Sequence, residues 1–257
     1  MVPSPSTRPT CRSTRSWQDS MNWSSNVRRC MADVDSFLAG DGVASRAFYR
    51  LVRNLLTFFC LTFWRTSVID RRHVPRSGPF ILAPVHRSYI DTPLVCSVTR
   101  RRMRYMGKDS LWKKRPVGWV LSALGGFPVS RGTADREALR RCIDVLEAGE
   151  PLVLFPEGER KSGETVQPLF DGVTYIALKS GVPVVPVGIG GSERAMPKGK
   201  KYLRPSKCVV LVGEPIMPPS NGGRASRSAV KDFSAYLHTE LQRLFDEAQA
   251  RAGFRAQ

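Results

Sequence analysis

The sequence predicts an α/β fold: one domain with a mixed, partly parallel central sheet flanked by helices, preceded by an amphipathic N-terminal helix. Two observations predict it. Short apolar runs rich in β-branched residues alternate along the chain with segments of helical period. Strand and helix in alternation favour a layered domain with neighbouring strands in parallel. At 257 residues, the chain is long enough to bury a substantial core.

The expected organisation has four parts. Residues 1–30 are rich in Ser, Thr, Pro and Arg and show neither helical nor strand period. They are expected to be disordered, to be a transit peptide, or to precede a true start at Met31. The last is favoured because patterned sequence begins soon afterwards. Residues 31–70 are expected to form an amphipathic membrane-associating helical segment, residues 71–250 the α/β domain, and residues 251–257 a tail.

An amphipathic helix is predicted over residues 44–64. Arg46, Arg50 and Arg53 recur at i, i+4 and i+7, which places three guanidinium groups on one stripe. Apolar side chains lie opposite them: Phe48, Leu51, Leu55, Phe58, Phe59 and Trp64. This pattern suits a membrane interface, where Arg meets lipid phosphate, and the alternative is a helix packed on the domain core. The interface is favoured because the charges all have one sign.

Five short apolar runs bounded by Gly or Pro predict the strands of the sheet. They cover residues 79–85, 125–130, 151–156, 182–189 and 208–213. Helical period between them predicts helices over residues 134–149 and 172–181, each ending in Gly. A last helix is predicted over residues 229–250, with an apolar stripe for docking: Val230, Phe233, Leu237, Leu241, Leu244 and Ala248.

The charge of the chain implies an anionic partner. Forty Lys and Arg against 22 Asp and Glu give a formal net charge of +18. Nucleic acid, a phosphorylated small molecule and an anionic membrane surface all satisfy such a balance. Nucleic acid is disfavoured because the basic clusters at residues 100–104, 113–115 and 198–204 lack the aromatic interleaving of a reading motif. The most apolar run, residues 54–64, is too short to span a bilayer.

The cysteines suggest neither a metal site nor a disulfide framework. Six are scattered along the chain, with no C-x-x-C pair and no Cys/His cluster at zinc spacing: Cys11, Cys30, Cys60, Cys96, Cys142 and Cys208. They are interpreted as thiols in a reducing compartment.

A candidate catalytic pair, His86 and Asp91, lies in "HRSYID". Residues five apart in one helix sit about 140° from each other, so the two side chains can meet only if His86 precedes the helix. Pro93 is best tolerated in a first turn, so the helix is expected to begin near Asp91, with residues 86–89 forming the turn before it. A carboxylate on one ring nitrogen then leaves the other free to accept a hydroxyl proton. The alternative is an ordinary loop in which Asp91 is only an N-cap.

Two arginines predict a phosphate clamp. "FPEGERKSG" places Glu157, Gly158 and Arg160 directly after a strand, at the carboxyl edge where ligands of α/β sheets bind. "GGFPVSRG" places Arg131 at the end of another strand. Guanidinium groups can grip phosphate oxygens in a bidentate way. A further block, "GVPVVPVGI", is expected to contribute shape rather than charge.

In order and spacing, "HRSYID", "GGFPVSR", "FPEGER" and "VPVVPVGI" resemble the four motifs of the glycerolipid acyltransferases, over about residues 72–219. "GKDSLWKKRPVGWVL" looks like the Lys-containing block that the family carries between its first two motifs. The resemblance implies that His86 is the general base on the acceptor's hydroxyl and that Asp91 orients it. It also implies binding roles for five residues: Arg131 and Arg160 on the phosphate of lysophosphatidate, Glu157 and Gly158 around the glycerol pocket, and Lys108 near the head group or the donor.

The implied reaction transfers a fatty acyl group from acyl-CoA or acyl carrier protein to lysophosphatidate, giving phosphatidate, with no metal or cofactor and no acyl-enzyme. The implied location is peripheral or monotopic on the anionic cytoplasmic side of the cell membrane. Glycerol 3-phosphate and other lysophospholipids are the alternative acceptors. Val85 stands where many members carry Asn, and Glu159 where Thr is usual, which leaves the head group open. Acyl length and oligomeric state are also left open.

Overall fold

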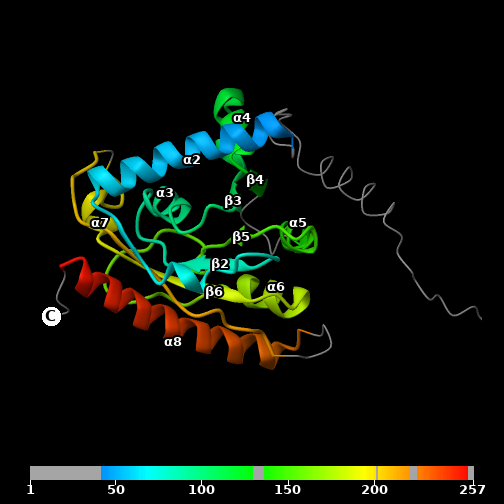
Figure 1. Ribbon diagram of the computed structural model, residues 1–257. Helices are drawn as coiled ribbons and strands as arrows, with labels where there is room; N and C mark the ends of the chain where they lie inside the picture. The colour runs from blue at the N-terminus through cyan, green and yellow to red at the C-terminus, as the bar shows by residue number, and fades with distance from the viewer. Residues whose placement is uncertain (1–41, 130–135, 201, 220–224, 254–257) are drawn as a thin grey trace, which may run out of the picture.

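The computed structural model describes residues 42–129, 136–200, 202–219 and 225–253. In this part of the chain, seven strands form one sheet between two layers of helices (Figure 1). The α/β fold with a mixed, partly parallel sheet is therefore confirmed. The expectations for residues 1–30 and for the last four residues of the tail lie outside the described residues.

The strands follow the order β1-β7-β6-β2-β5-β3-β4 across the sheet. Neighbouring strands are parallel except for β6 and β7, which are antiparallel. All five predicted strands are present, mostly with narrower bounds, and two were not predicted: β1, which is very short, and β3, which contains charged residues. The bounds are β1 Ser67–Ile69, β2 Ile81–Pro84, β3 Arg104–Lys108, β4 Gly126–Val129, β5 Leu152–Val153, β6 Val184–Gly190 and β7 Val209–Val212.

The helices divide between the two faces of the sheet. In Figure 1, α2, α3 and α4 lie above the sheet and α8 lies below it; α5 packs on α6 and α6 on α8. From β2 to β4 the chain moves toward the β4 edge of the sheet, and from β4 to β6 it moves back. Because crossovers between parallel strands are right-handed, the first direction places α3 and α4 on one face and the second places α5 and α6 on the other. The bounds are α2 Val43–Phe63, α3 Asp91–Cys96, α4 Arg115–Ala123, α5 Arg136–Glu147, α6 Gly172–Ser180, α7 Ser192–Ala195 and α8 Arg227–Arg251.

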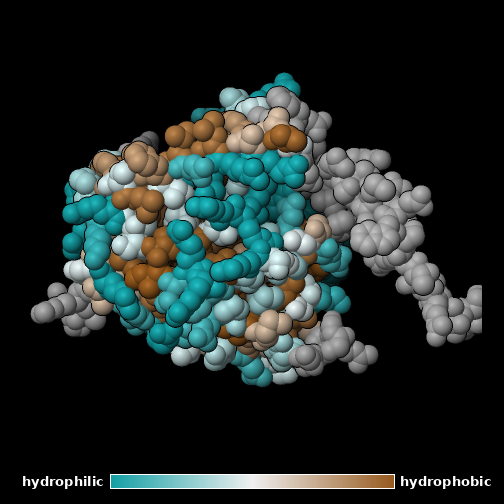
Figure 2. Space-filling view, viewed as in Figure 1, coloured by the Kyte–Doolittle hydropathy of each residue, from teal (hydrophilic) through white to brown (hydrophobic). Residues whose placement is uncertain are grey.

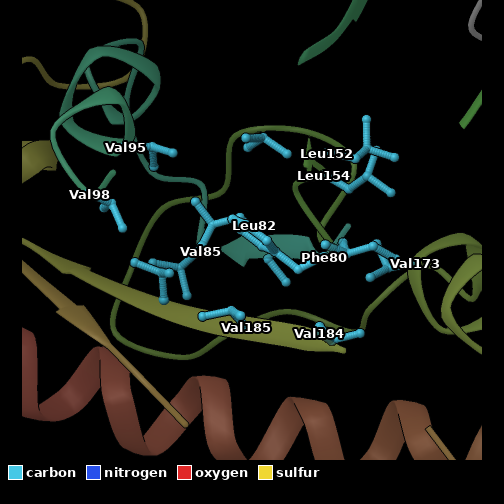
Figure 3. Close-up of a cluster of buried hydrophobic side chains, with 14 of the residues drawn as sticks. Phe80, Leu82, Val85, Val95, Val98, Leu152, Leu154, Val173, Val184 and Val185 are labelled. Carbon is cyan, nitrogen blue, oxygen red and sulfur yellow. The ribbon is translucent and has the colours of Figure 1, made fainter. Parts of the chain in front are cut away.

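The core is centred on β2, β5 and β6. Figure 3 shows side chains from these strands and their flanks, among them Leu82, Leu154 and Val185, packed together between the helices. Every residue of β2 and β6 is buried. Strands covered on both faces have no side that meets water, which is why they appear in the sequence as continuous apolar runs rather than as alternating patterns.

Two glycines allow α8 to lie directly on β6. A Cβ atom at Gly190 would stand 2.1 Å from the carbonyl oxygen of Ala248, and one at Gly188 would stand 2.2 Å from that of Leu244. No side chain fits in that space. The predicted apolar stripe of α8 is buried along its whole length. Gly188 belongs to "GVPVVPVGI", so this block makes a close contact between a strand and a helix backbone, and its expected contribution to the shape of the site stays a prediction.

The predicted N-terminal helix is present as α2, but its arginines do not share one environment. Arg46 and Arg50 are exposed, whereas Arg53 is 8% exposed and its Nε donates a hydrogen bond to the carbonyl oxygen of Thr99 at 2.9 Å. The prediction that all three face lipid is wrong for Arg53, because its guanidinium satisfies a carbonyl of the segment after α3. Trp64 is also buried, so it does not belong to an outward apolar face.

The outward side of α2 is apolar. Leu51, Leu55 and Phe58 are 59%, 59% and 67% exposed, while Tyr49 and Cys60 on the inner side are buried. Figure 2 shows the hydrophobic band that runs along this helix at the top of the molecule. In the described part of the chain, no helix combines the length and the apolar character required to span a bilayer.

Candidate functional site

The candidate site lies where β2 and β5 end. These strands are adjacent and parallel, so their carboxyl ends meet at the same edge of the sheet. His86 follows β2 after one residue, and Glu157 follows β5 after three. Two segments separated by about seventy residues of sequence are thereby brought together, and Lys161 N donates a hydrogen bond to His86 O at 2.9 Å.

The structure joins His86 to Asp91. Nδ1 of His86 lies 3.0 Å from Oδ2 of Asp91. Helix α3 begins at Asp91, so His86 stands in the turn before it, and this geometric prediction is confirmed. Asp91 is fully buried, whereas the His86 side chain is 14% exposed. One end of the pair is shielded and the other is open to a substrate.

Three N–H groups converge on the Asp91 carboxylate. Besides the imidazole, the backbone N–H groups of Arg87 and Ser88 donate to Oδ2 at 2.6 and 2.7 Å. A carboxylate that accepts from Nδ1 fixes the tautomer in which Nε2 carries the lone pair. No described residue forms a hydrogen bond with Nε2. The ring of His86 also stacks on Phe155, with centroids 4.0 Å apart, which restricts its rotation. The imidazole is thus held through Nδ1 and its ring face, which leaves Nε2 as a hydrogen-bond acceptor.

A buried ion pair supports this turn. Nη1 of Arg87 donates to both carboxylate oxygens of Glu157 at 2.8 Å, and both side chains are almost completely shielded from solvent. Nη2 of Arg87 donates to Thr165 O, and the guanidinium lies over the ring of Phe245 in α8. Sequence reasoning missed Arg87, although its place inside "HRSYID" was the available signal. A buried arginine with this many partners fixes the segments it joins.

All the hydrogen bonds of Glu157 are made with groups of the protein itself. Oε2 also accepts from His86 N, and Oε1 accepts from Gln167 N, both at 3.0 Å. The carboxylate is fully buried, so it holds the His86 turn from inside the protein, and its predicted role around the glycerol pocket stays a prediction. Gly158 is exposed, and its φ of 68° is a conformation that glycine adopts more readily than other residues; a Cβ there would stand 2.6 Å from the ring of Phe170.

Arg160 is partly exposed beside this turn. Its guanidinium lies over the ring of Tyr89, 3.3 Å from the centroid, and no described residue accepts a hydrogen bond from it. The neighbouring Glu159 directs Oε1 to Nζ of Lys161 at 2.8 Å. An anion next to the predicted phosphate site is therefore neutralised by an adjacent cation.

The other two predicted binding residues belong to the next strands. Lys108 is the last residue of β3, paired in register with Val129 of β4. Arg131 lies outside the described residues, just beyond the end of β4. β3 and β4 stand two and three strands from β2, or roughly 10 and 14 Å at the usual strand spacing. The clamp formed by Arg131 and Arg160 stays a prediction.

The described residues contain no group of three or more metal-binding side chains. The four cysteines in the described part of the chain are free, and burial raises the pKa of Cys60, Cys142 and Cys208 to about 12. Their thiols stay protonated at neutral pH and are poor nucleophiles. The titratable side chains that the structure brings together at the candidate site include the imidazole of His86 and the carboxylates of Asp91 and Glu157.

Comparison with known proteins identifies related chains. The acyltransferase family model matches residues 65–190, a span that includes β1 through β6 and the whole candidate site. A chloroplastic 1-acyl-sn-glycerol-3-phosphate acyltransferase of Brassica napus is 27% identical over 176 residues, which cover 66% of this chain and 51% of that protein. The enzyme of the same name from Bacillus subtilis (strain 168) is 26% identical over 197 residues, covering 76% and 96%.

A solved structure is also similar. The 1-acyl-sn-glycerophosphate acyltransferase of Thermotoga maritima superposes with a TM-score of 0.67 at 26% identity, and the match covers 82% of this chain and 83% of that one. The chain spans about half the length of the Brassica napus relative but nearly all of the Bacillus subtilis one.

Proposed function

Because the acyltransferase family model matches residues 65–190, we propose that the chain is an acyltransferase that moves a fatty acyl group from acyl-CoA or acyl carrier protein to the free hydroxyl of 1-acyl-glycerol 3-phosphate, giving phosphatidate. The observation that carries the proposal is the His86–Asp91 pair at the edge of the sheet, in which Nδ1 is bound to a buried carboxylate and the His86 side chain is partly exposed. Relatives that bear this activity in their names support the choice of acceptor.

The geometry suits general-base catalysis. His86 Nε2 takes the proton of the acceptor's hydroxyl as its oxygen attacks the thioester carbonyl, and Asp91 stabilises the imidazolium that forms. The tetrahedral intermediate then collapses, the carbon–sulfur bond breaks, and the leaving thiol receives the proton from His86. An oxygen ester and a free thiol result. The chain itself forms no covalent bond to the acyl group, and the proposed step uses no metal or cofactor.

Arg160 is proposed to hold the acceptor's phosphate. In 1-acyl-glycerol 3-phosphate, two carbons and one ester oxygen separate the free hydroxyl from phosphorus, so both must bind close together. The hydrogen bond from Lys161 N to His86 O keeps Arg160 beside the base. Arg131 and Lys108 are proposed as further contacts to the phosphate or the donor from the ends of β4 and β3. In glycerol 3-phosphate, the terminal hydroxyl lies one carbon farther away, which would displace it from His86.

We further propose that the protein binds the anionic cytoplasmic face of the cell membrane peripherally. The exposed apolar side of α2 supports this: among the described residues, Leu51, Leu55 and Phe58 are all more than half exposed. Figure 2 shows the hydrophobic band along this helix. Arg46 and Arg50 are exposed on the same helix, where they can meet lipid phosphate. Such attachment would bring the site to a lipid acceptor.

A direct assay tests the proposed reaction. Purified protein is supplied with acyl-CoA or acylated carrier protein and with 1-acyl-glycerol 3-phosphate, glycerol 3-phosphate or other lysophospholipids, and the released thiol is measured. We expect the highest kcat/KM with 1-acyl-glycerol 3-phosphate. His86→Ala should lower the rate by at least about a hundredfold, the usual loss for a general base.

His73→Gln is the matched control, because His73 Nδ1 lies 3.0 Å from the carbonyl oxygen of Val212, the last residue of β7, and contacts neither His86 nor the Arg87–Glu157 pair. It should keep most of the activity. Retention of more than about a hundredth of the rate in His86→Ala would contradict the mechanism. A preference for another acceptor would contradict the proposed substrate while leaving the acyl transfer in place.

A further inference from the structure

The contact between Arg160 and Tyr89 is not explained by folding alone. The centre of the Arg160 guanidinium lies 3.3 Å from the Tyr89 ring centroid, yet Tyr89 is 56% exposed. An exposed ring under a partly exposed arginine buries little apolar area, so its contribution to the stability of the fold is small. The two residues also come from different blocks, the turn after β2 and the loop after β5.

The backbone beneath Tyr89 is rigid. Ser88 on one side donates its N–H to Asp91 Oδ2 at 2.7 Å and its hydroxyl to Met196 O at 2.7 Å. Ile90 on the other side is buried, with 3% of its surface exposed. The ring therefore projects from a segment that is anchored at both neighbours, and it provides a fixed surface for the side chain above it.

Stacking leaves the binding edge of Arg160 free. A guanidinium in contact with a ring uses its face, while its five N–H donors point outward in its own plane. Among the described residues, none accepts a hydrogen bond from Arg160. A planar group with one face covered and its edge unoccupied is arranged for bidentate contact with an oxyanion such as phosphate.

We propose that Tyr89 is a positioning residue for the acceptor's phosphate. Its ring holds the Arg160 guanidinium in one plane, so that the N–H edge meets the phosphate without first losing side-chain freedom. The proposal rests on the proposed function, in which Arg160 binds that phosphate. Tyr89 acts through Arg160 and touches no reacting atom, so its effect belongs to acceptor binding and not to the chemical step.

The test compares Tyr89→Leu, Tyr89→Phe, Arg160→Gln and the double variant Tyr89→Leu/Arg160→Gln. We expect Tyr89→Leu to raise KM for 1-acyl-glycerol 3-phosphate about fivefold, the scale of one cation–π contact, with kcat and the KM for acyl-CoA unchanged. Tyr89→Phe keeps the ring and should restore KM. In the double variant, the loss of Tyr89 should add nothing to the effect of Arg160→Gln, because coupled residues are not additive.

Equilibrium binding separates this proposal from the proposed function. The dissociation constant of 1-hexanoyl-glycerol 3-phosphate is measured by calorimetry below its micelle concentration, with no acyl donor present. If this dissociation constant depends on Tyr89 and Arg160 but the activity assay shows no acyl transfer, the positioning role stands and the proposed reaction is wrong. If acyl transfer proceeds and Tyr89→Leu binds like the wild type, the positioning role is wrong.

Two further outcomes would also overturn the positioning role. In the first, Tyr89→Leu lowers kcat and thermal stability together, which indicates a structural residue. In the second, the effects of the two substitutions add in the double variant, which indicates independent action.

Discussion

The two longest described helices, α2 and α8, lie on opposite faces of the sheet and differ in whether the predicted apolar stripe is buried (Figure 1). α8 buries its apolar stripe against β6 and β7, with Leu237 and Leu241 fully shielded. α2 presents apolar side chains outward, with Leu55 and Phe58 more than half exposed, and buries Arg53 together with Tyr49 and Cys60 on its inner side. Both helices have an apolar stripe in the sequence, yet only one uses it for the core.

The difference shows that an apolar stripe identifies a face but not its partner. For α8, the partner is a strand whose glycines accept a helix backbone. For α2, the contacts with the domain use Tyr49, Arg53, Cys60 and Trp64, most of which lie off the predicted apolar stripe. Because α2 docks on the domain mainly through residues off the predicted stripe, the stripe itself is left for another environment, which we propose to be a membrane.

The largest effect is expected where α8 meets β6. Gly190→Ala places a Cβ 2.1 Å from the carbonyl oxygen of Ala248, so α8 must move away or the fold must fail. We expect the free energy of unfolding to fall by more than about 4 kcal/mol in urea denaturation. Gly42→Ala, at the N-cap of α2, has no atom within 4 Å of the added Cβ and should cost less than about 1 kcal/mol. Equal losses would contradict the close-contact role.

The same leucine truncation should distinguish the two helices. Leu241→Ala in α8 removes a fully buried side chain and is expected to cost about 2–5 kcal/mol of unfolding free energy. Leu55→Ala in α2 removes one that is 59% exposed and should change stability by less than about 0.5 kcal/mol. Denaturant melts of both variants check this, and a large loss for Leu55→Ala would show that α2 packs on protein.

Stability should depend more on α8 than on α2, whereas membrane binding should depend more on α2 than on α8. Phe58→Ser on α2 is expected to weaken binding to vesicles containing anionic lipid by at least about tenfold, because burying a Phe side chain is worth about 1.5–3 kcal/mol. Tyr236→Ser is the control on α8, since Tyr236 has a similar exposure of 59%. Co-sedimentation gives the partition coefficients. Equal binding by the wild type and Phe58→Ser would remove α2 as the contact surface.

The smallest effect concerns the inner side of α2. Burial raises the pKa of the Cys60 thiol from 9.0 to about 12. A raised pKa favours the protonated thiol in the folded state, so this stabilisation is complete below pH 9 and is lost as the pH rises toward 12. We expect the wild type to lose about 1 kcal/mol more than Cys60→Ala between pH 8 and pH 10. Parallel stability curves for the two proteins would contradict a buried thiol.

Much of the fold could be predicted because its strands are buried on both faces. β2 and β6 appear as unbroken apolar runs, and Gly181 ends α6 in a left-handed conformation as its position in the sequence indicates. β3 could not be predicted, because Arg104 and Lys108 at its ends hide a strand near the edge of the sheet. β1 was missed since it has only three residues.

The site could be predicted in part for a similar reason. Local turn chemistry around Pro93 predicted where α3 begins, and therefore the approach of His86 to Asp91. The Arg87–Glu157 ion pair could not be predicted in this way, because the two residues are about seventy positions apart and only the order of strands makes them neighbours. The same limit applies to the stacking of Arg160 on Tyr89.

The pairing of β1 with β7 has a consequence for the order of folding. Ser67 is in register with Val209, which lies 142 residues later in the chain. The strand that follows α2 therefore has no partner until these residues have been synthesised. At about 5–20 residues per second, this takes roughly 7–28 s. During that interval, α2 has left the ribosome while its adjoining strand is unpaired. Its apolar face is therefore available to a nearby bilayer before the domain is complete, and ribosome-bound chains truncated before Val209 should show α2 sensitive to protease in the absence of lipid.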